Sequence, residues 1–271
     1  THISGFTIQN GSNSGIILDW AGPTLTDLEI RDNAAYEGGG MWIGWAWPII
    51  ENVIIDNNTS TSQGGGVLIT GTGLNNMDEI FNPVTFNNVI FSNNQAGEVG
   101  GGLYAFQAVG FHISNSVFFN NEGFDGGALY LHNYSSVYLD RVTITDNIAP
   151  QGAGIYTRYG STAIVTNSII SDNDGESQIT IHDMEDGNLP TADISYTNLQ
   201  GGDAGVVDND GGLVWGDGNI DVDPLITDPA NGDFTLEWGS PCINAADPSG
   251  DPDPDGTYPD MGAYTFDMYD D

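Results

Sequence analysis

The chain has 271 residues and a formal net charge of −35, and its only strongly basic residues are three arginines. This balance excludes a nucleic-acid partner, because phosphate binding needs a basic surface. No apolar run reaches the roughly 20 residues of a transmembrane helix, so no membrane insertion is expected. Such acidity favours salty surroundings and hence a marine or halophilic source, and it favours Ca²⁺, which prefers carboxylate oxygens.

A repeat is already under way at residue 1, and its step is 27 residues from Asn94 to Asn121 and 26 from Asn121 to Asn147. A first turn column contains Gly5, Asp27, Asn52, Asn88, Asn115, Arg141, Asn167 and Asp193. A second turn column contains Gly11, Asn33, Asn58, Asn94, Asn121, Asn147 and Asn173. An apolar column between them contains Ile8, Ile30, Ile55, Phe91, Phe118, Ile144, Ile170 and Tyr196. Steps of this length indicate stacked structural units.

When the same residue type recurs once per unit, equivalent residues of successive units are expected to lie directly above one another. Parallel strands stacked at about 4.8 Å have this arrangement. Aliphatic residues then stack inside, and asparagines form a hydrogen-bonded ladder at the turns. The period of 3.6 residues that a helical solenoid needs is not sustained. The sequence therefore predicts an all-β fold, a right-handed parallel β-helix with three short strands per coil and about eight coils.

The β-helix is predicted over 1–226, followed by an irregular C-terminal capping segment with an acidic tail over 227–271. One coil, between Gly64 and Asn94, carries extra residues around 72–83. Insertions in a solenoid form loops on one face, where they either bind a ligand or are merely tolerated.

The first strand of each coil carries the clearest site signal. Its second residue after the glycines is predicted to point outward, and its fourth does too, because side chains alternate along a strand. The second positions include Trp42, Leu68, Tyr104, Tyr130 and Tyr156. The fourth positions include Thr70, Phe106, His132, Arg158 and His182. Histidine and arginine are thus aligned on consecutive coils beside tyrosines.

Two acidic runs near the C-terminus are candidate Ca²⁺ sites. The first is Asp217, Asn219, Asp221 and Asp223. The second is Asp251, Asp253 and Asp255. The first run has the alternation of an EF-hand loop, but Val222 stands where that loop needs glycine and no glutamate closes it. A solvated acidic surface is the alternative for both. The single cysteine, Cys242, is expected to be a buried apolar residue.

Three motifs close the chain: Gly-Asn-Ile-Asp-Val-Asp-Pro-Leu at 218–225, Gly-Ser-Pro-Cys-Ile-Asn at 239–244 and Asp-Met-Gly-Ala-Tyr at 260–264. With these motifs the chain resembles bacterial secreted right-handed β-helix repeat proteins, including polymorphic-outer-membrane-like and pectate-lyase-like proteins. It departs from the usual pattern at Asn244 and Ala246, where Asp and Gly are typical. The resemblance implies the fold; the family includes adhesins, surface proteins and polysaccharide-active enzymes, so the function stays open.

In pectate-lyase-like proteins the outward face of the equivalent strand holds the sugar groove, which implies a site here. For a lyase, the candidate catalytic residues are His132, Arg158, His182 and Tyr156, since Tyr or His moves a proton and Arg neutralises a sugar carboxylate. The alternative is an aromatic ladder in which His and Arg pair with acids such as Asp125 or Asp183. Candidate sugar-stacking residues are Trp42, Trp45, Trp47, Tyr104, Phe106 and Tyr130, with ordinary surface packing as the alternative.

The favoured hypothesis is an extracellular, secreted bacterial β-helix with a structural or adhesive role at the cell surface and contact with glycans. The other hypothesis is a Ca²⁺-assisted polysaccharide lyase or related enzyme. Open ends of a β-helix expose unpaired backbone groups. We expect Thr227–Phe266 to cover the C-terminal end, and either upstream chain or end-to-end association with another subunit to cover the first coil.

Overall fold

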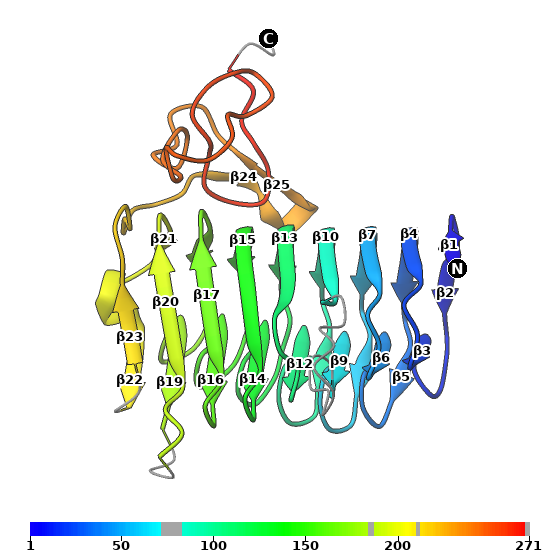
Figure 1. Ribbon diagram of the computed structural model, residues 1–271. Helices are drawn as coiled ribbons and strands as arrows, with labels where there is room; N and C mark the ends of the chain where they lie inside the picture. Colours follow the sequence, from blue (N-terminus) through cyan, green and yellow to red (C-terminus); the bar gives the residue numbers. More distant parts are fainter. Residues whose placement is uncertain (72–82, 184–186, 210–211, 269–271) are drawn as a thin grey trace.

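The computed structural model describes residues 1–71, 83–183, 187–209 and 212–268, and shows a parallel β-helix with an irregular C-terminal segment on its flank (Figure 1). The insertion predicted around 72–83 lies almost entirely outside the described residues. Within the described ranges, the helical elements are two 3₁₀ turns, η1 (Gly202–Gly205) and η2 (Pro229–Asn231). None of the helices that these residues form has the length and apolar character to cross a membrane.

One sheet is built from the first strand of every coil, and we call it the short-strand sheet. Its members are β3 (Ile16–Asp19), β6 (Met41–Gly44), β9 (Val67–Thr70), β12 (Leu103–Phe106), β14 (Leu129–His132), β16 (Ile155–Arg158), β19 (Ile179–His182) and β22 (Val206–Asn209). All neighbours in this sheet are parallel, and Tyr104, Tyr130 and Tyr156 are paired across β12, β14 and β16. The predicted alignment of these strands is confirmed.

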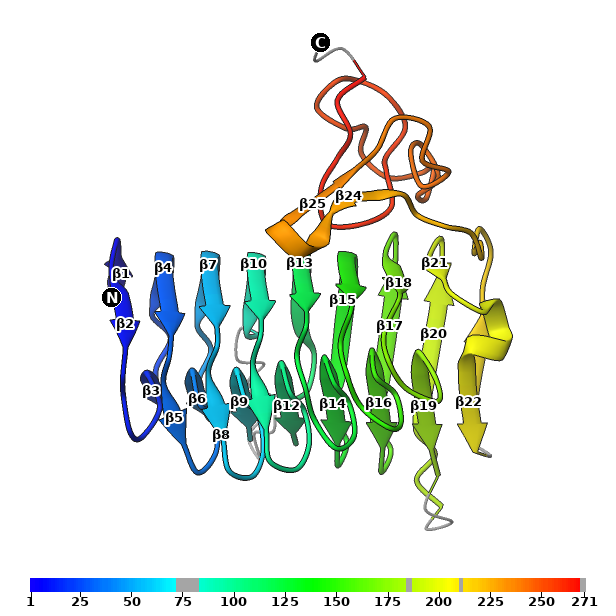
Figure 2. The same ribbon diagram turned by 180° about the vertical axis from the view of Figure 1, so that it is seen from behind.

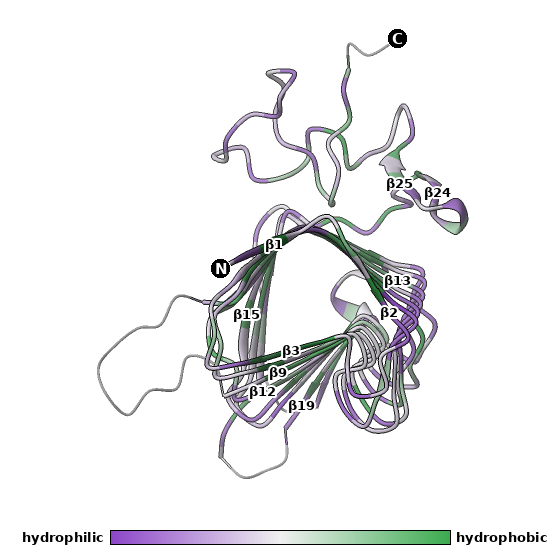
Figure 3. Ribbon diagram, turned by 90° about the vertical axis from the view of Figure 1, so that its right-hand side faces the viewer, coloured by the Kyte–Doolittle hydropathy of each residue, from purple (hydrophilic) through white to green (hydrophobic). Residues whose placement is uncertain are grey.

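A second sheet, the long-strand sheet, completes the coils. Its members are β1 (His2–Ser4), β2 (Thr7–Gln9), β4 (Thr24–Arg31), β7 (Ile49–Asp56), β10 (Thr85–Ser92), β13 (Phe111–Phe119), β15 (Ser136–Thr145), β17 (Thr162–Thr166), β18 (Ile169–Ser171), β20 (Thr191–Ser195), β21 (Asn198–Leu199) and β23 (Gly212–Trp215). Most long strands bend at a left-handed residue of the first turn column, such as Asn88 or Asn115, with φ of 53° and 47°. Each bent strand therefore supplies two of the three predicted sides, and the end-on view has a three-sided outline (Figure 3).

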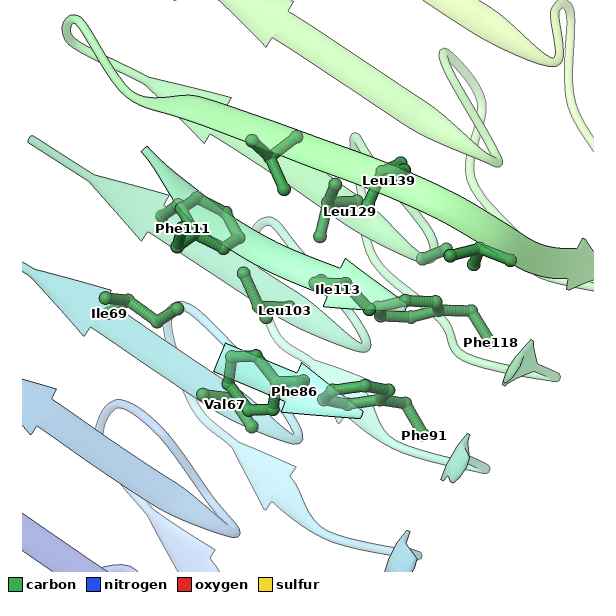
Figure 4. Packing of buried hydrophobic residues seen from close by; sticks show 14 of the residues in the cluster. Val67, Ile69, Phe86, Phe91, Leu103, Phe111, Ile113, Phe118, Leu129 and Leu139 are labelled. Atoms are coloured by element: carbon green, nitrogen blue, oxygen red, sulfur yellow. The ribbon is translucent and has the colours of Figure 1, made fainter. Parts of the chain in front are cut away.

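Short bridges follow the second turn, in a sheet of β5 (Ala34–Ala35), β8 (Thr59–Ser60) and β11 (Gln95–Ala96). The lumen is filled by apolar columns in register: Phe86 pairs with Ile113, and Phe91 with Phe118. The rings of Phe91 and Phe118 stack with centroids 4.3 Å apart and an angle of 1° between planes (Figure 4). This packing confirms that the predicted apolar columns point inward.

The asparagine ladder of the second turn column, Asn33–Asn173, is also confirmed. Each side-chain amide donates to the side-chain oxygen of the next coil, for example Asn94 Nδ2 to Asn121 Oδ1 at 2.9 Å and Asn121 Nδ2 to Asn147 Oδ1 at 2.8 Å. The same amides also donate to backbone oxygens, as Asn121 does to Phe91. These buried side chains thus bond to one another and to backbone groups of the second turn.

Beyond Asn173 the predicted register is wrong by three residues. Asp193, placed in the first turn column, instead pairs with Ile164, and the turn is made by Tyr196 with a φ of 46°. Leu199, not Tyr196, lies opposite Ile170. The step from Thr162 to its partner Thr191 is 29 residues, because this coil carries a longer connection between β19 and β20. A constant step of 26 residues therefore fails here.

The C-terminal segment was expected to cover the last coil. It instead folds back along the side of the solenoid (Figures 1 and 2). It contains an antiparallel pair, β24 (Ile226–Asp228) and β25 (Asp233–Leu236). Phe234 and Ala263 pack on Val117, while Cys242 and Met261 pack on Ile169. Burying these apolar side chains of the flank and of the segment against one another stabilises this position.

Candidate functional site

The candidate catalytic side chains do gather on the outer face of the short-strand sheet. Tyr104, Tyr130 and Tyr156 form a column, and the rings of Tyr130 and Tyr156 stack with centroids 4.8 Å apart and planes 4° apart. His132 and His182 lie in the neighbouring column with Arg158, since Arg158 pairs with His182. We call this set the tyrosine–histidine–arginine stack.

The tyrosines point away from the lumen, as predicted, yet they are only 2–3% exposed. The glycine that begins each of these coils lies close to the Cβ atom of the tyrosine of its own coil. Gly126, with a φ of +63°, is one such residue: a Cβ there would lie 2.9 Å from Tyr130 Cβ and 2.7 Å from the Leu129 oxygen. Glycine adopts this left-handed conformation at little steric cost, and any side chain here would also meet those two atoms. The repeated glycines therefore allow the chain to pass close to the base of each tyrosine, while the rings pack against one another and against Trp42, Val99 and Phe106.

Polar atoms of the stack bond to one another across coils. Tyr104 Oη lies 2.9 Å from His132 Nδ1, one coil away. Tyr156 Oη lies 2.7 Å from His182 Nδ1. Arg158 donates to Tyr130 Oη at 3.5 Å and sits 4.9 Å from the ring centre of Tyr159, a residue the sequence analysis did not select.

Burial disfavours the charged forms of His132, Tyr104 and Tyr156. It lowers the pKa of His132 to about 4, with a smaller contribution from the positive charge of Arg158. It raises the pKa of Tyr104 and of Tyr156 well above the usual value for tyrosine. Burial likewise raises the pKa of Asp125, although Arg158 and His182 act in the opposite direction. A tyrosine held this way is a poor general base at neutral pH.

The predicted aromatic platform is divided in two. Tyr104 and Tyr130 belong to the buried stack and offer no open ring face, and Phe106 makes an edge contact with His132 at 5.4 Å. Trp42 is half-buried over Gly44 on β6. Trp47 is also half-buried and packs against Gly22.

Trp45 is the exposed member of the predicted platform, and it stacks on a residue that the sequence analysis missed. Trp45 is 43% exposed and Trp20 58% exposed, with ring centroids 6.0 Å apart and planes 7° apart. Both sit at the left-handed corner directly after the short strand, with φ of 44° and 51°. Trp20 and Trp45 both stand five residues after the glycine that precedes their strand, Gly15 and Gly40, and this recurrence is the signal that would have identified Trp20. This pair lies on the coils of β3 and β6, away from the histidines and Arg158.

The side chains of the first acidic run bond to the backbone of the preceding coil and of their own loop. Asn219 accepts from Thr197 N and donates to the Ile194 oxygen. Asp221 accepts from Gly201 N, and Asp223 from Leu225 N. In the part of the chain that the structure describes, no three His, Cys, Asp or Glu side chains are grouped as metal ligands.

The second run behaves similarly. Asp255 accepts from both the backbone and the hydroxyl of Thr257, and Asp253 accepts from Asp260 N. Asp251 is exposed at the surface. Asp260, which the sequence analysis did not select, is buried and accepts from Asn244 N and Phe266 N. The closing motif Asp-Met-Gly-Ala-Tyr is thus explained by the folding of the segment.

A solenoid of parallel coils with a continuous asparagine ladder and a cohesive outer stack defines a class of elongated β-helix proteins. The family model described as a right-handed beta helix region matches residues 76–222, more than half of the chain, so the chain belongs to this family. A Chlamydia polymorphic membrane protein repeat matches residues 52–70.

Among characterised proteins, the chain is similar to the probable autotransporter YfaL of Escherichia coli (strain K12). The two are 32% identical over 152 residues, which cover 51% of this chain but 12% of the relative. The chain thus spans about an eighth of the length of that protein. No solved structure matches the chain.

Proposed function

We propose that this chain is part of an extracellular bacterial surface protein, in which the β-helix is a rigid structural and adhesive module. The similarity to an autotransporter and to a polymorphic membrane protein repeat supports placement at the bacterial surface. The geometric observation that carries the structural role is the set of bonds that join coils in the stack: Tyr104 with His132, Tyr156 with His182, and Arg158 with Tyr130. These groups serve the cohesion of the solenoid.

The adhesive part of the proposal rests on the exposed pair Trp20 and Trp45. Flat, open indole faces stack on the apolar faces of sugar rings. A net charge of −35 repels anionic polymers, so the proposed ligand is a neutral glycan.

The adhesive role is tested by retention of the purified chain on immobilised neutral and acidic polysaccharides. We expect retention on a neutral polysaccharide that Trp45→Ala abolishes. The matched control is Trp238→Ala, which removes an indole that is 74% exposed on the C-terminal segment. Equal retention of both variants, or retention on acidic polymers alone, would contradict the proposal.

A polysaccharide lyase is the second candidate, because Arg158 and His182 act electrostatically on Asp125 at the edge of the same stack. Release of unsaturated sugars from an acidic polysaccharide, lost in Arg158→Ala, would support it. Absence of products with the parent chain, together with a lower melting temperature of Arg158→Ala, would favour the structural role.

Ca²⁺ remains a proposal based on the excess of carboxylates, 38 acids against three arginines. A divalent ion that binds the folded chain raises its melting temperature by mass action. The measurement is the melting temperature at low ionic strength with CaCl₂ and with a chelator. An unchanged melting temperature would contradict the Ca²⁺ proposal.

End-to-end association of the chain also remains a proposal. It is tested by measuring the molecular mass of the chain in solution over a range of concentrations.

A further inference from the structure

A groove lies on the outside of the second turn, before the chain enters the short strands, whereas Trp20 and Trp45 directly follow those strands. Two adjoining hollows of about 440 and 610 Å³ form this groove, and both are lined by Gln95, Glu122 and Ile148. Gln95 pairs with Glu122, and Glu122 with Ile148, on successive coils. The groove therefore follows the axis of the solenoid, and its size is within the range of ligand sites.

The first hollow is bordered by a row of amides outside the buried asparagine ladder. Asn57, Asn93 and Asn120 are exposed, and each has a left-handed backbone, with φ of 52°, 54° and 51°. Asn93 Nδ2 donates to Asp56 Oδ1 at 2.7 Å, and Asn120 Nδ2 to Asn93 Oδ1 at 2.7 Å. Because a primary amide carries two N–H groups, these bonds orient each amide and leave it a second donor for a ligand.

Gln95 and Glu122, which line both hollows, hold each other in place. Gln95 Nε2 donates to Glu122 Oε2 at 3.0 Å. Within the described ranges, Gln95 Oε1 and Glu122 Oε1 accept no hydrogen bond from the protein. The groove thus offers both oriented donors and oriented acceptors. A hydroxyl group both donates and accepts, whereas a cation has no use for N–H donors, so this lining favours a ligand rich in hydroxyls.

The second hollow adds an aromatic wall. Phe124 lines this hollow and is 67% exposed. Gly97 and Gly123 lie beside it, and a Cβ at Gly97 would lie 2.4 Å from the Thr61 oxygen, so the backbone there leaves no room for a side chain. An open phenyl ring next to such a space is suited to stacking on the apolar face of a sugar ring.

We propose that this groove is a second saccharide site, in which a neutral sugar chain lies along the axis of the solenoid. Phe124 stacks on one sugar ring, while Gln95 and Glu122 bond to its hydroxyls. Asn93 and Asn120 bond to the next sugar, in the adjoining hollow. The net charge of −35 favours a neutral chain over an acidic one. This site goes beyond the proposed adhesive role of the tryptophan pair and does not depend on that pair.

Two sites on one module bind a polymer more tightly than either site alone. Engagement of both raises the affinity by about 10²–10⁴-fold when the geometry permits it. Loss of the tryptophan pair therefore abolishes retention on an immobilised polysaccharide, while the groove still binds a short oligosaccharide. A short soluble ligand accordingly separates the two sites.

The test is equilibrium dialysis of the full chain against labelled cellotetraose, maltotetraose and mannotetraose. For one of these probes we expect two molecules bound per parent chain, one per chain in Phe124→Ala and one in Trp45→Ala. The double variant should bind none. Tyr36→Ala is the matched control, because it removes another aromatic side chain that is 71% exposed and does not line the groove. An unchanged melting temperature of Phe124→Ala verifies that the solenoid stays folded.

Gln95→Ala tests the hydroxyl contacts separately from the stacking. In the Trp45→Ala background it should weaken binding of the same probe about fivefold, since it removes hydrogen bonds from the ligand and frees the Glu122 side chain. One molecule bound per parent chain, lost in Phe124→Ala and kept in Trp45→Ala, would support the groove and contradict the role of the tryptophan pair. Parent-like binding in Phe124→Ala, or an equal loss in Tyr36→Ala, would overturn the inference.

Discussion

Two buried columns run along this solenoid and are held together in different ways. The asparagine ladder repeats one residue type, and each amide both donates to and accepts from its neighbours. The tyrosine–histidine–arginine stack instead joins unlike groups in pairs, such as Tyr156 with His182. The ladder lies inside the second turn, where its side chains also bond to backbone groups, and the stack lies on the outer face of a complete sheet.

This difference in hydrogen bonding predicts how well each column tolerates substitution. A ladder member satisfies backbone groups that have no other partner, so its replacement leaves several buried polar groups unpaired. A member of the stack bonds to a single side chain, while the sheet beneath satisfies its own backbone. We therefore expect the ladder to determine stability and the stack to tolerate change.

The largest effect is expected for Asn121→Leu, which would test the ladder directly. The side chain of Asn121 accepts from the backbone and the side chain of Asn94 and donates to Phe91 and Asn147. Leaving these buried groups unpaired should lower the free energy of unfolding by about 3–5 kcal/mol. Urea unfolding of the parent and the variant measures this difference in the free energy of unfolding. The control is Asn120→Gly, which removes one exposed bond to Asn93; similar losses would refute the distinction.

Gly126→Ala tests the glycines that lie close to the stack. The added Cβ meets the Leu129 oxygen at 2.7 Å in a left-handed backbone conformation, so we expect a loss of about 2–3 kcal/mol. Gly110→Ala provides the comparison, because its φ is +70° but nothing lies within 4 Å of the added atom. The difference between the two melting temperatures isolates the close packing over Tyr130. If they agree, backbone strain alone explains the glycine column.

A smaller effect is expected for Tyr156→Phe. The ring and its stacking on Tyr130 remain, while the bond to His182 Nδ1 at 2.7 Å is lost. Such a bond contributes about 1 kcal/mol. Thermal unfolding should detect this shift, and Tyr36→Phe, at a side chain that is 71% exposed, should give none. If Tyr156→Phe lowered the free energy of unfolding as much as Asn121→Leu does, the stack would contribute as much to stability as the ladder, which would contradict the distinction.

The smallest effect concerns pH. The pKa of His132 is about 4 in the folded chain, below its ordinary value of 6.5, so the unfolded chain binds the extra proton first. Stability from this group is complete above about pH 6.5 and is lost as the pH falls towards 4, by about 1 kcal/mol or less at a partly exposed site. Compared with the parent, His132→Gln should lose less stability between pH 7 and pH 4. His112→Gln should follow the parent, and a parent-like slope in His132→Gln would contradict the assignment.

The columns of the solenoid were readable from the sequence because stacking places successive coils in equivalent surroundings. Asn94, Asn121 and Asn147 each occupy the same corner, so each position requires the same residue. The alignment of Arg158 with His182 followed from the same counting. The same counting gave the wrong position for Asp193. The connection between β19 and β20 is longer than in the preceding coils, and no change in residue type near Asp193 reveals the longer step.

The burial of Tyr104, Tyr130 and Tyr156 was decided by tertiary structure. Alternation along a strand places these side chains outside the lumen, but it does not show that they pack against one another and against Trp42, Val99 and Phe106. The position of the C-terminal segment was also beyond the sequence, since the bond between Ala263 and Thr143 joins residues 120 positions apart. In the repeated coils, sequence periodicity determines which residues lie next to one another. The C-terminal segment has no such period, and its position depends on a surface that exists only after the solenoid has formed.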